Sequence, residues 1–177
     1  YLFRVKDGFL EHLHFGPRAE FSDAQAFAVQ PGCGWGDSVQ YDERSNACCM
    51  DILPLEWSGH GRGDFRESPI ELERGGEAIE TEFRYLGCEA LREPPASRLP
   101  RTRGEKLLAV YLEDAAAELR LTLYYGVTPA AFTRRAVLEN CGKTAVTVRK
   151  LMSMSLDLPG ELMLHTFSGG WIAEMQH

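Results

Sequence analysis

Residues 56–68, which read EWSGHGRGDFRES, hold the side chains best suited to gripping a ligand. Glycines at positions 59, 61 and 63 disfavour both a helix and a central strand, so we expect a loop here. A carboxylate, an aromatic ring and a guanidinium follow at once, in Asp64, Phe65 and Arg66. Carboxylates accept hydrogen bonds from hydroxyl pairs and aromatic rings cover apolar faces, so this set suits a polyhydroxylated ligand. The alternative interpretation is a glycine-rich hairpin tip with solvated charges.

The other polar residues of the chain do not identify a catalytic site. Six carboxylates are of the type that cleaves glycosidic bonds in pairs, but the sequence singles out no pair among Asp37, Asp42, Glu43, Asp51, Glu56 and Asp64. The sequence contains no nucleophile elbow and no phosphate-binding or dinucleotide-binding motif. Further ligands at a usual spacing are missing around His12 and His14, so we predict no metal site and no cofactor.

Composition bounds the class of protein. The 177 residues give room for one domain. Their 19 basic and 26 acidic side chains give a formal net charge of −7, which argues against nucleic acid or an anionic membrane as the partner. No apolar run approaches the roughly 20 residues that span a bilayer. Five cysteines, without a C-x-x-C spacing, favour reduced and mostly buried thiols, so we expect a cytoplasmic protein.

Apolar residues recur at alternate positions, the pattern typical of strands. The alternation is clearest at 118–125 and at 146–158, and the second run is long enough that we expect a twisted or bulged strand. Further strands are predicted at 2–5, 10–15, 47–53, 79–91, 107–113, 132–140 and 161–167. Helical periodicity with caps is nowhere sustained for more than about two turns. The sequence therefore predicts an all-β fold, an antiparallel β-sandwich.

Near the end of the chain, Gly169 and Gly170 precede Trp171 after the last predicted strand. The indole is either an exposed platform at the rim of a sheet or a core residue, and the residues themselves leave both interpretations open.

Four motifs, taken in order, resemble those of a known family. They are GDFR at 63–66 after LEW at 55–57, AFTRRAVLEN at 131–140, MSMSLDLP at 152–159, and SGGW at 168–171 with Glu174. Over essentially its whole length the chain resembles the N-terminal region of bacterial and fungal α-galactosidases of glycoside hydrolase family 36. The joint occurrence of the four motifs is specific, although no single motif is.

This resemblance implies a larger parent enzyme. Enzymes of the family begin with an antiparallel β-supersandwich of the galactose-mutarotase type, continue into a (β/α)8 barrel and finish with a small β domain. They remove terminal α-linked galactose from oligosaccharides such as raffinose and melibiose with retention of configuration, and both catalytic aspartates lie in the barrel. We therefore expect residues 1–177 to form a single non-catalytic N-terminal domain, with the barrel beyond residue 177 and no hydrolytic activity in the isolated chain.

The resemblance also implies substrate-binding residues. Trp171 matches a tryptophan that helps to wall the galactose pocket, and Asp64, Phe65 and Arg66 match a loop near that pocket, which in some members reaches a neighbouring subunit's site. The family also binds sugar hydroxyls through an N-terminal aspartate.

The region that holds this aspartate corresponds to residues 21–38 here, and its sequence differs from the family's commoner pattern. Asp23 and Asp37 are the candidates in this region. The expected partners are an α-galactoside oligosaccharide, the protein's own barrel and further copies in a homo-oligomer, a tetramer being frequent in the family. Raffinose, melibiose, a polysaccharide branch and an α-N-acetylgalactosaminide all stay open as substrates.

Two other classes of protein compete with this interpretation. One is a free-standing carbohydrate-binding module that stacks sugars on Trp35, Trp57 and Trp171. The other is a purely structural assembly domain, which would form oligomers without binding sugar.

Overall fold

Antiparallel strands make up most of the regular secondary structure in the described part of this chain. The structure is a computed structural model that describes residues 1–28, 52–59, 66–98, 104–129, 131–156, 158, 160–163, 165–166, 168–170 and 173–176. Within these ranges the helical segments are one short turn, η1 (Phe21–Asp23), and one short helix, α1 (Ala24–Phe27).

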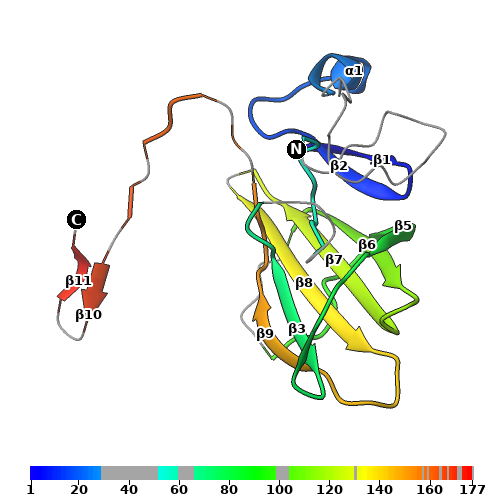
Figure 1. Cartoon of the computed structure of the whole chain (residues 1–177). Helices are drawn as coiled ribbons and strands as arrows, with labels where there is room; N and C mark the ends of the chain where they lie inside the picture. Colours follow the sequence, from blue (N-terminus) through cyan, green and yellow to red (C-terminus); the bar gives the residue numbers. More distant parts are fainter. Residues whose placement is uncertain are drawn as a thin grey trace.

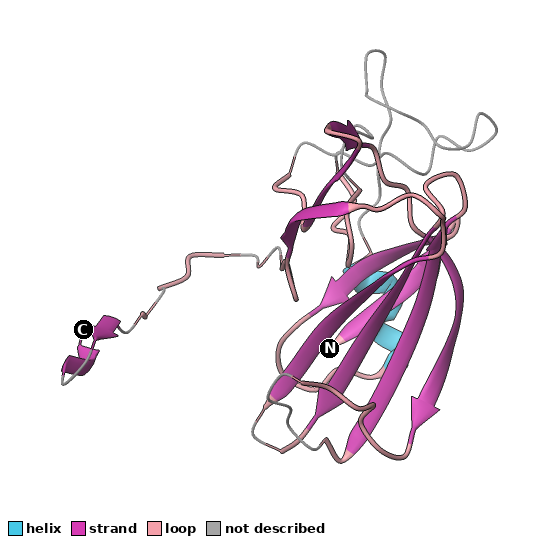
Figure 2. Cartoon of the chain, turned by 90° about the horizontal axis from the view of Figure 1, so that it is seen from below, coloured by secondary structure: helices cyan, strands magenta, loops and turns pink. Residues whose placement is uncertain are grey.

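A four-stranded antiparallel sheet, the main sheet, is the largest element (Figure 2). It runs in the order β5-β6-β7-β8, so strands that are consecutive in the sequence are neighbours in space. Its strands are β5 (Arg84–Leu91), β6 (Lys106–Asp114), β7 (Leu119–Val127) and β8 (Phe132–Asn140). Side chains alternate between the faces of a strand, and the β7 residues Leu121 and Leu123 are fully buried on one face. They pair with Leu112 and Val110 of β6, so this face forms the core.

A second sheet covers the core face of the main sheet (Figure 1). It has the order β4-β3-β9, with β3 (Ile70–Arg74), β4 (Glu77–Ile79) and β9 (Thr147–Leu151). Ile70 and Leu72 of β3 belong to the same buried cluster as Leu121 and Leu123 of β7. The two sheets thus enclose one hydrophobic core, and the predicted all-β, antiparallel sandwich is confirmed.

The described residues form two further hairpins. The first pairs β1 (Leu2–Lys6) with β2 (Phe9–His14) and adds Leu10 to the core. Its turn uses Asp7 and Gly8 at φ of 50° and 83°, the left-handed region that suits a two-residue turn. The second pairs β10 (Ser168–Gly170) with β11 (Ala173–Gln176), and Figure 1 shows it well away from the two sheets.

The predicted strand at 146–158 is wrong in its second half, because β9 ends at Leu151. The partner strand β3 begins at Ile70, and the pairing closes with the Met152 amide, which donates to the Pro69 carbonyl at 2.8 Å. Beyond this point the described residues of 152–167 before β10 include no strand, although the alternation continues. Alternation reports which side chains are apolar, whereas a strand also needs a neighbour to pair with.

The predicted strand at 79–91 is in fact two strands in two sheets. β4 ends at Ile79 in the smaller sheet, and β5 begins at Arg84 in the main sheet. At the crossing the Glu82 amide donates to the side-chain carboxylate of Asp114 at 2.7 Å, and not to a backbone carbonyl as in a strand ladder. The strand β3 was not predicted, and most of the predicted strand at 47–53 lies outside the described residues.

The expected burial of the thiols is wrong for the two cysteines that the structure describes. Cys88 and Cys141 are free and exposed, because β5 is an edge strand of its sheet and Cys141 lies in the turn after β8.

Gly59 should be intolerant of any side chain. A Cβ at this position would lie 2.1 Å from the carbonyl oxygen of Thr81, so Gly59→Ala forces two backbone segments apart. We expect the free energy of unfolding to fall by about 1–3 kcal/mol, measured by urea denaturation. Gly87→Ala is the matched control, because a Cβ there meets no atom within 4 Å. Equal losses in the two variants would contradict the prediction.

Candidate functional site

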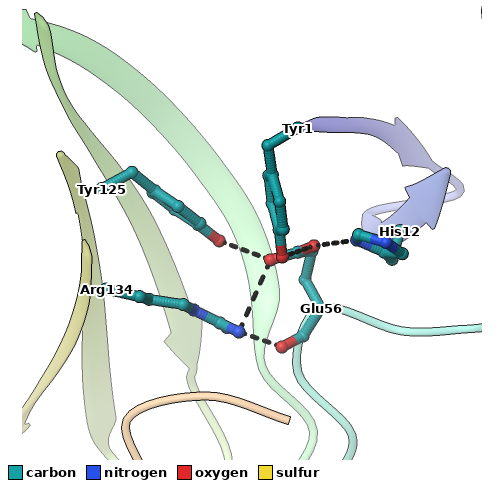
Figure 3. Close-up of polar contacts among 5 residues, drawn as sticks. All are labelled: Tyr1, His12, Glu56, Tyr125 and Arg134. Atoms are coloured by element: carbon teal, nitrogen blue, oxygen red, sulfur yellow. Dashed lines mark hydrogen bonds and ion pairs between the residues drawn. The ribbon is translucent and has the colours of Figure 1, made fainter. Parts of the chain in front are cut away.

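A buried carboxylate, that of Glu56, lies between the β1–β2 hairpin and the main sheet (Figure 3). The residue is 1% exposed. The Tyr1 hydroxyl donates to its Oε1 at 2.5 Å, and the Tyr125 hydroxyl donates to its Oε2 at 2.8 Å. The Nδ1 atom of His12 lies 2.8 Å from Oε1. Both carboxylate oxygens are therefore engaged by side chains that are distant in sequence.

Arg134 completes this group of residues. Its Nη2 donates to the backbone carbonyl of Glu56 at 2.6 Å, and its Nη1 lies 3.6 Å from Oε2. The guanidinium carbon also lies 5.4 Å from the centre of the Tyr125 ring. We call Tyr1, His12, Glu56, Tyr125 and Arg134 the Glu56 cluster. Its central ion pair is almost fully shielded from water, with side chains that are 1% and 0% exposed.

Backbone hydrogen bonds hold the segment of Glu56 in place. The Glu56 amide donates to the Leu10 carbonyl at 2.9 Å, and the His12 amide donates to the Pro54 carbonyl at 2.7 Å. Leu55 forms an antiparallel bridge with Glu11 of β2. The segment thus lies along β2 in extended pairing, which directs the Glu56 side chain toward the main sheet, as Figure 3 shows.

The cluster keeps Glu56 ionised. Burial alone would raise the pKa of the Glu56 carboxyl. The hydrogen bond from His12, the charge of Arg134 and the hydrogen bonds from Tyr1 and Tyr125 outweigh this effect and hold the pKa below its usual value. A carboxylate only accepts hydrogen bonds, so the His12 Nδ1–H must be the donor. Burial, followed by the charge of Glu56, raises the pKa of both tyrosines, which stay neutral.

An enclosed carboxylate of this kind is an anchor rather than a reactive group. Both of its oxygens accept hydrogen bonds from the protein, and the residue is 1% exposed. A general acid or base must reach the proton that it transfers, and Glu56 faces its own partners instead. Of the carboxylates considered in the sequence, this one therefore serves to fix the 56–68 segment at its first residue.

Both described flanks of the 56–68 segment are attached to the sandwich. After Glu56, Trp57 packs edge-on against Phe83 at 6.5 Å between ring centres. On the other flank the Ser68 hydroxyl donates to the Ile70 carbonyl at 2.7 Å. Glu67 pairs with Lys150 of β9 at 2.5 Å. Both described ends of the 56–68 segment are thus in contact with the sandwich.

Two of the six predicted substrate-binding residues fall in the described ranges. Arg66 is half-buried and precedes β3, on the second flank of the 56–68 segment. Asp23 is exposed at the end of η1, where its carboxylate accepts hydrogen bonds from the Glu20 amide at 3.2 Å and the Ser22 hydroxyl at 3.4 Å. Asp37, Asp64, Phe65 and Trp171 lie outside the described residues. All six assignments stay predictions.

The sequence contains one indication of the Glu56 cluster, a charged residue on an otherwise apolar strand face. Arg134 lies on the core face of β8 together with Phe132, Ala136 and Leu138, which alternate along the strand. A charge on a core face needs a buried partner of opposite sign. The pattern therefore predicts a buried acid, but it does not say which one.

Among the described residues, no group of three or more potential metal ligands occurs. None of the helices that the structure describes has the length and the apolar character that crossing a membrane requires.

Comparison with known proteins identifies the family. Residues 8–177 match the model of the glycosyl hydrolase family 36 N-terminal domain, so the chain belongs to this family. It is 28% identical over 184 residues to alpha-galactosidase 2 of Hypocrea jecorina, which covers 98% of this chain and 23% of that protein. It is also 28% identical over 162 residues to alpha-galactosidase AgaA of Geobacillus stearothermophilus, covering 87% of this chain and 22% of that protein. The resemblance seen in the sequence is confirmed.

Solved structures agree with this assignment. A variant of AgaA from Geobacillus stearothermophilus in complex with stachyose superposes with a TM-score of 0.76 at 26% identity, over 90% of this chain and 23% of that chain. Another AgaA variant, in complex with raffinose, gives 0.75 at 26% identity, over 89% of this chain and 23% of that chain. The chain thus spans about a quarter of the length of the relatives that it matches.

The Glu56 cluster should contribute strongly to stability. Glu56→Gln leaves Arg134 buried without its negative partner, so we expect the free energy of unfolding to fall by about 3–5 kcal/mol in urea denaturation at pH 7. Glu105→Gln is the control, because Glu105 is exposed and should change stability by less than about 0.5 kcal/mol. Similar values for the two variants would show that the cluster is not an anchor.

The contribution of Glu56 should depend on pH with a definite sign. Its pKa is lower in the folded state than the ordinary 4.5, so its stabilisation is present above pH 4.5 and is lost as the pH falls through the folded value. The tyrosines, whose pKa is raised above 10.0, lose their contribution only above pH 10. The stability difference between wild type and Glu56→Gln should therefore shrink in acid. A difference that grows on acidification would contradict the assigned ionisation.

Proposed function

We propose that this chain is the non-catalytic N-terminal domain of an α-galactosidase that removes terminal α-D-galactosyl residues from oligosaccharides with retention of configuration. The observation that carries the proposal is the family match over residues 8–177, made to enzymes of which this chain spans about a quarter. On this proposal residues 1–177 form one domain, and the catalytic barrel belongs to the remaining length of the enzyme. The isolated chain is then inactive.

Within that enzyme we assign the 56–68 segment to the rim of the substrate pocket. Support comes from its two anchored flanks, the Glu56 cluster on one side and the Ser68 and Glu67 contacts on the other. A segment whose ends are attached to the fold loses less conformational freedom when it binds a ligand than one with free ends, which favours affinity. Asp64 would accept hydrogen bonds from sugar hydroxyls, and Arg66 would donate to them.

The ligand class and the assembly follow from the same proposal. Two variants of one relative, AgaA of Geobacillus stearothermophilus, were solved with raffinose and with stachyose, so an α-galactoside oligosaccharide is the proposed ligand of the whole enzyme. Trp171 is proposed as a further wall of the pocket, and Asp23 or Asp37 as an additional contact to the sugar. The domain would also pack on the barrel and contribute to a homo-oligomer.

One observation weighs against the alternative of a free-standing carbohydrate-binding module. That alternative uses Trp57 as a stacking platform, but Trp57 is 6% exposed and packs against Phe83. A sugar can stack only on an aromatic face that it can reach.

A kinetic experiment on the full-length enzyme tests the pocket assignment. Asp64→Asn should raise KM for raffinose by about 10-fold to 100-fold, the effect of losing one charged hydrogen bond. Asp7→Asn is the matched control, because Asp7 is exposed in the β1–β2 turn and should leave KM unchanged. An unchanged KM in Asp64→Asn would refute the assignment, and hydrolysis of raffinose by the isolated chain would refute the non-catalytic role.

A further inference from the structure

The outer face of the main sheet, opposite the core, carries two neighbouring tyrosines. Tyr111 of β6 and Tyr124 of β7 both project from this face, since each alternates with core residues of its strand. Tyr124 pairs with Ala109, and Tyr111 pairs with Thr122, so the two rings form a diagonal pair on adjacent strands. Aromatic side chains are long enough to interact across such a diagonal. Both rings are only half-buried.

Two hollows open on this face, and both are lined by Tyr124. The first has a volume of about 330 Å³ and is also lined by Tyr111, Leu86, Arg120, Thr122 and Glu139. The second, of about 170 Å³, is lined by Tyr124, Leu91, Pro94, Pro95, Thr133 and Arg135, and also by Tyr125 and Arg134, the neighbouring positions of β7 and β8. Tyr124 therefore stands where the two hollows meet, with apolar and polar groups in each.

Polar side chains around the tyrosines pair with one another at the surface. The Tyr111 hydroxyl donates to Glu89 at 3.0 Å, and Arg120 donates through Nε to Glu113 at 3.1 Å. The Arg135 guanidinium lies 4.8 Å from the centre of the Tyr124 ring. Exposed pairs of this kind contribute little to stability, so their polar groups can form hydrogen bonds to a ligand at little cost.

The charges on this face favour a neutral ligand. Arg120 and Arg135 alternate with Glu89, Glu113 and Glu139, so neither a polyanion nor a polycation meets a field of one sign. Sugar hydroxyls both donate and accept hydrogen bonds, and they match guanidinium and carboxylate groups together. The apolar face of a sugar ring matches a tyrosine ring.

We propose that the outer face binds a neutral oligosaccharide, with one sugar unit in each hollow and Tyr124 as the platform between them. The inference rests on the proposed function only for the class of ligand, an α-galactoside oligosaccharide. The platform Tyr124 projects from the face opposite to the one on which Tyr125 and Arg134 contact Glu56, the first residue of the 56–68 segment.

Titration of the chain with stachyose tests the inference. We expect calorimetric binding with a Kd near 1 mM, and Tyr124→Ala should weaken it at least about fivefold. Tyr124→Phe keeps the ring and should stay within about twofold of wild type. Phe21→Ala removes an aromatic ring that is 86% exposed elsewhere on the chain, so it is the control for unspecific stacking. Circular dichroism confirms that each variant is folded.

The outcomes separate this inference from the proposed function. No heat at about 10 mM stachyose, or equal affinity in wild type and Tyr124→Ala, would overturn the outer-face site. Binding lost in Asp64→Asn but kept in Tyr124→Ala would also overturn it, while supporting the role of the 56–68 segment. Conversely, loss of stachyose binding in Tyr124→Ala alone supports the outer-face site. This holds whatever KM for raffinose the full-length Asp64→Asn enzyme shows.

Discussion

The charge of Glu56 is buried, and a buried charge is tolerated only when the protein surrounds it with compensating groups. Here the compensation comes from four separate parts of the chain: the N-terminal residue, β2, β7 and β8. A two-stranded hairpin is marginal by itself, so β1 and β2 depend on being docked. Leu10 docks the hairpin through the core, and the Glu56 cluster docks it through polar contacts whose geometry is much more specific.

Strand bounds are predicted best where apolar and polar residues alternate and the strand pairs with its neighbour without a break. Residues 132–140 were predicted with the observed bounds of β8, because the apolar residues of one face of that strand, partly buried, pack against the core. A strand with one buried face has its register fixed by the hydrophobic pattern. The hydrophobic pattern does not reveal the change of sheet between Ile79 and Arg84, because the tertiary fold determines which strand pairs with which.

The candidate site shows the same division between local and tertiary information. The glycines and polar residues of the 56–68 segment predict a loop from the sequence alone, because loop formation depends on local composition. The role of Glu56 is not, because Tyr1, His12, Tyr125 and Arg134 meet only once the hairpin has docked on the main sheet. Arg134 on an apolar face signals that an acid is needed, and the fold decides that Glu56 supplies it.

The two faces of the main sheet use charge in opposite ways. On the core face Arg134 is 1% exposed, so separating it from Glu56 leaves an uncompensated charge and the pair acts as a fixed anchor. On the outer face the side chains of Arg120 and Glu113 are 58% and 33% exposed. Such exposed pairs contribute about 0–1 kcal/mol to stability, so they are exchanged for other hydrogen-bond partners at little cost. Polar groups that the fold does not need for stability, arranged around half-buried rings, are free to serve recognition. That difference in energetic cost is why we place the proposed oligosaccharide site on the outer face and not at the Glu56 cluster.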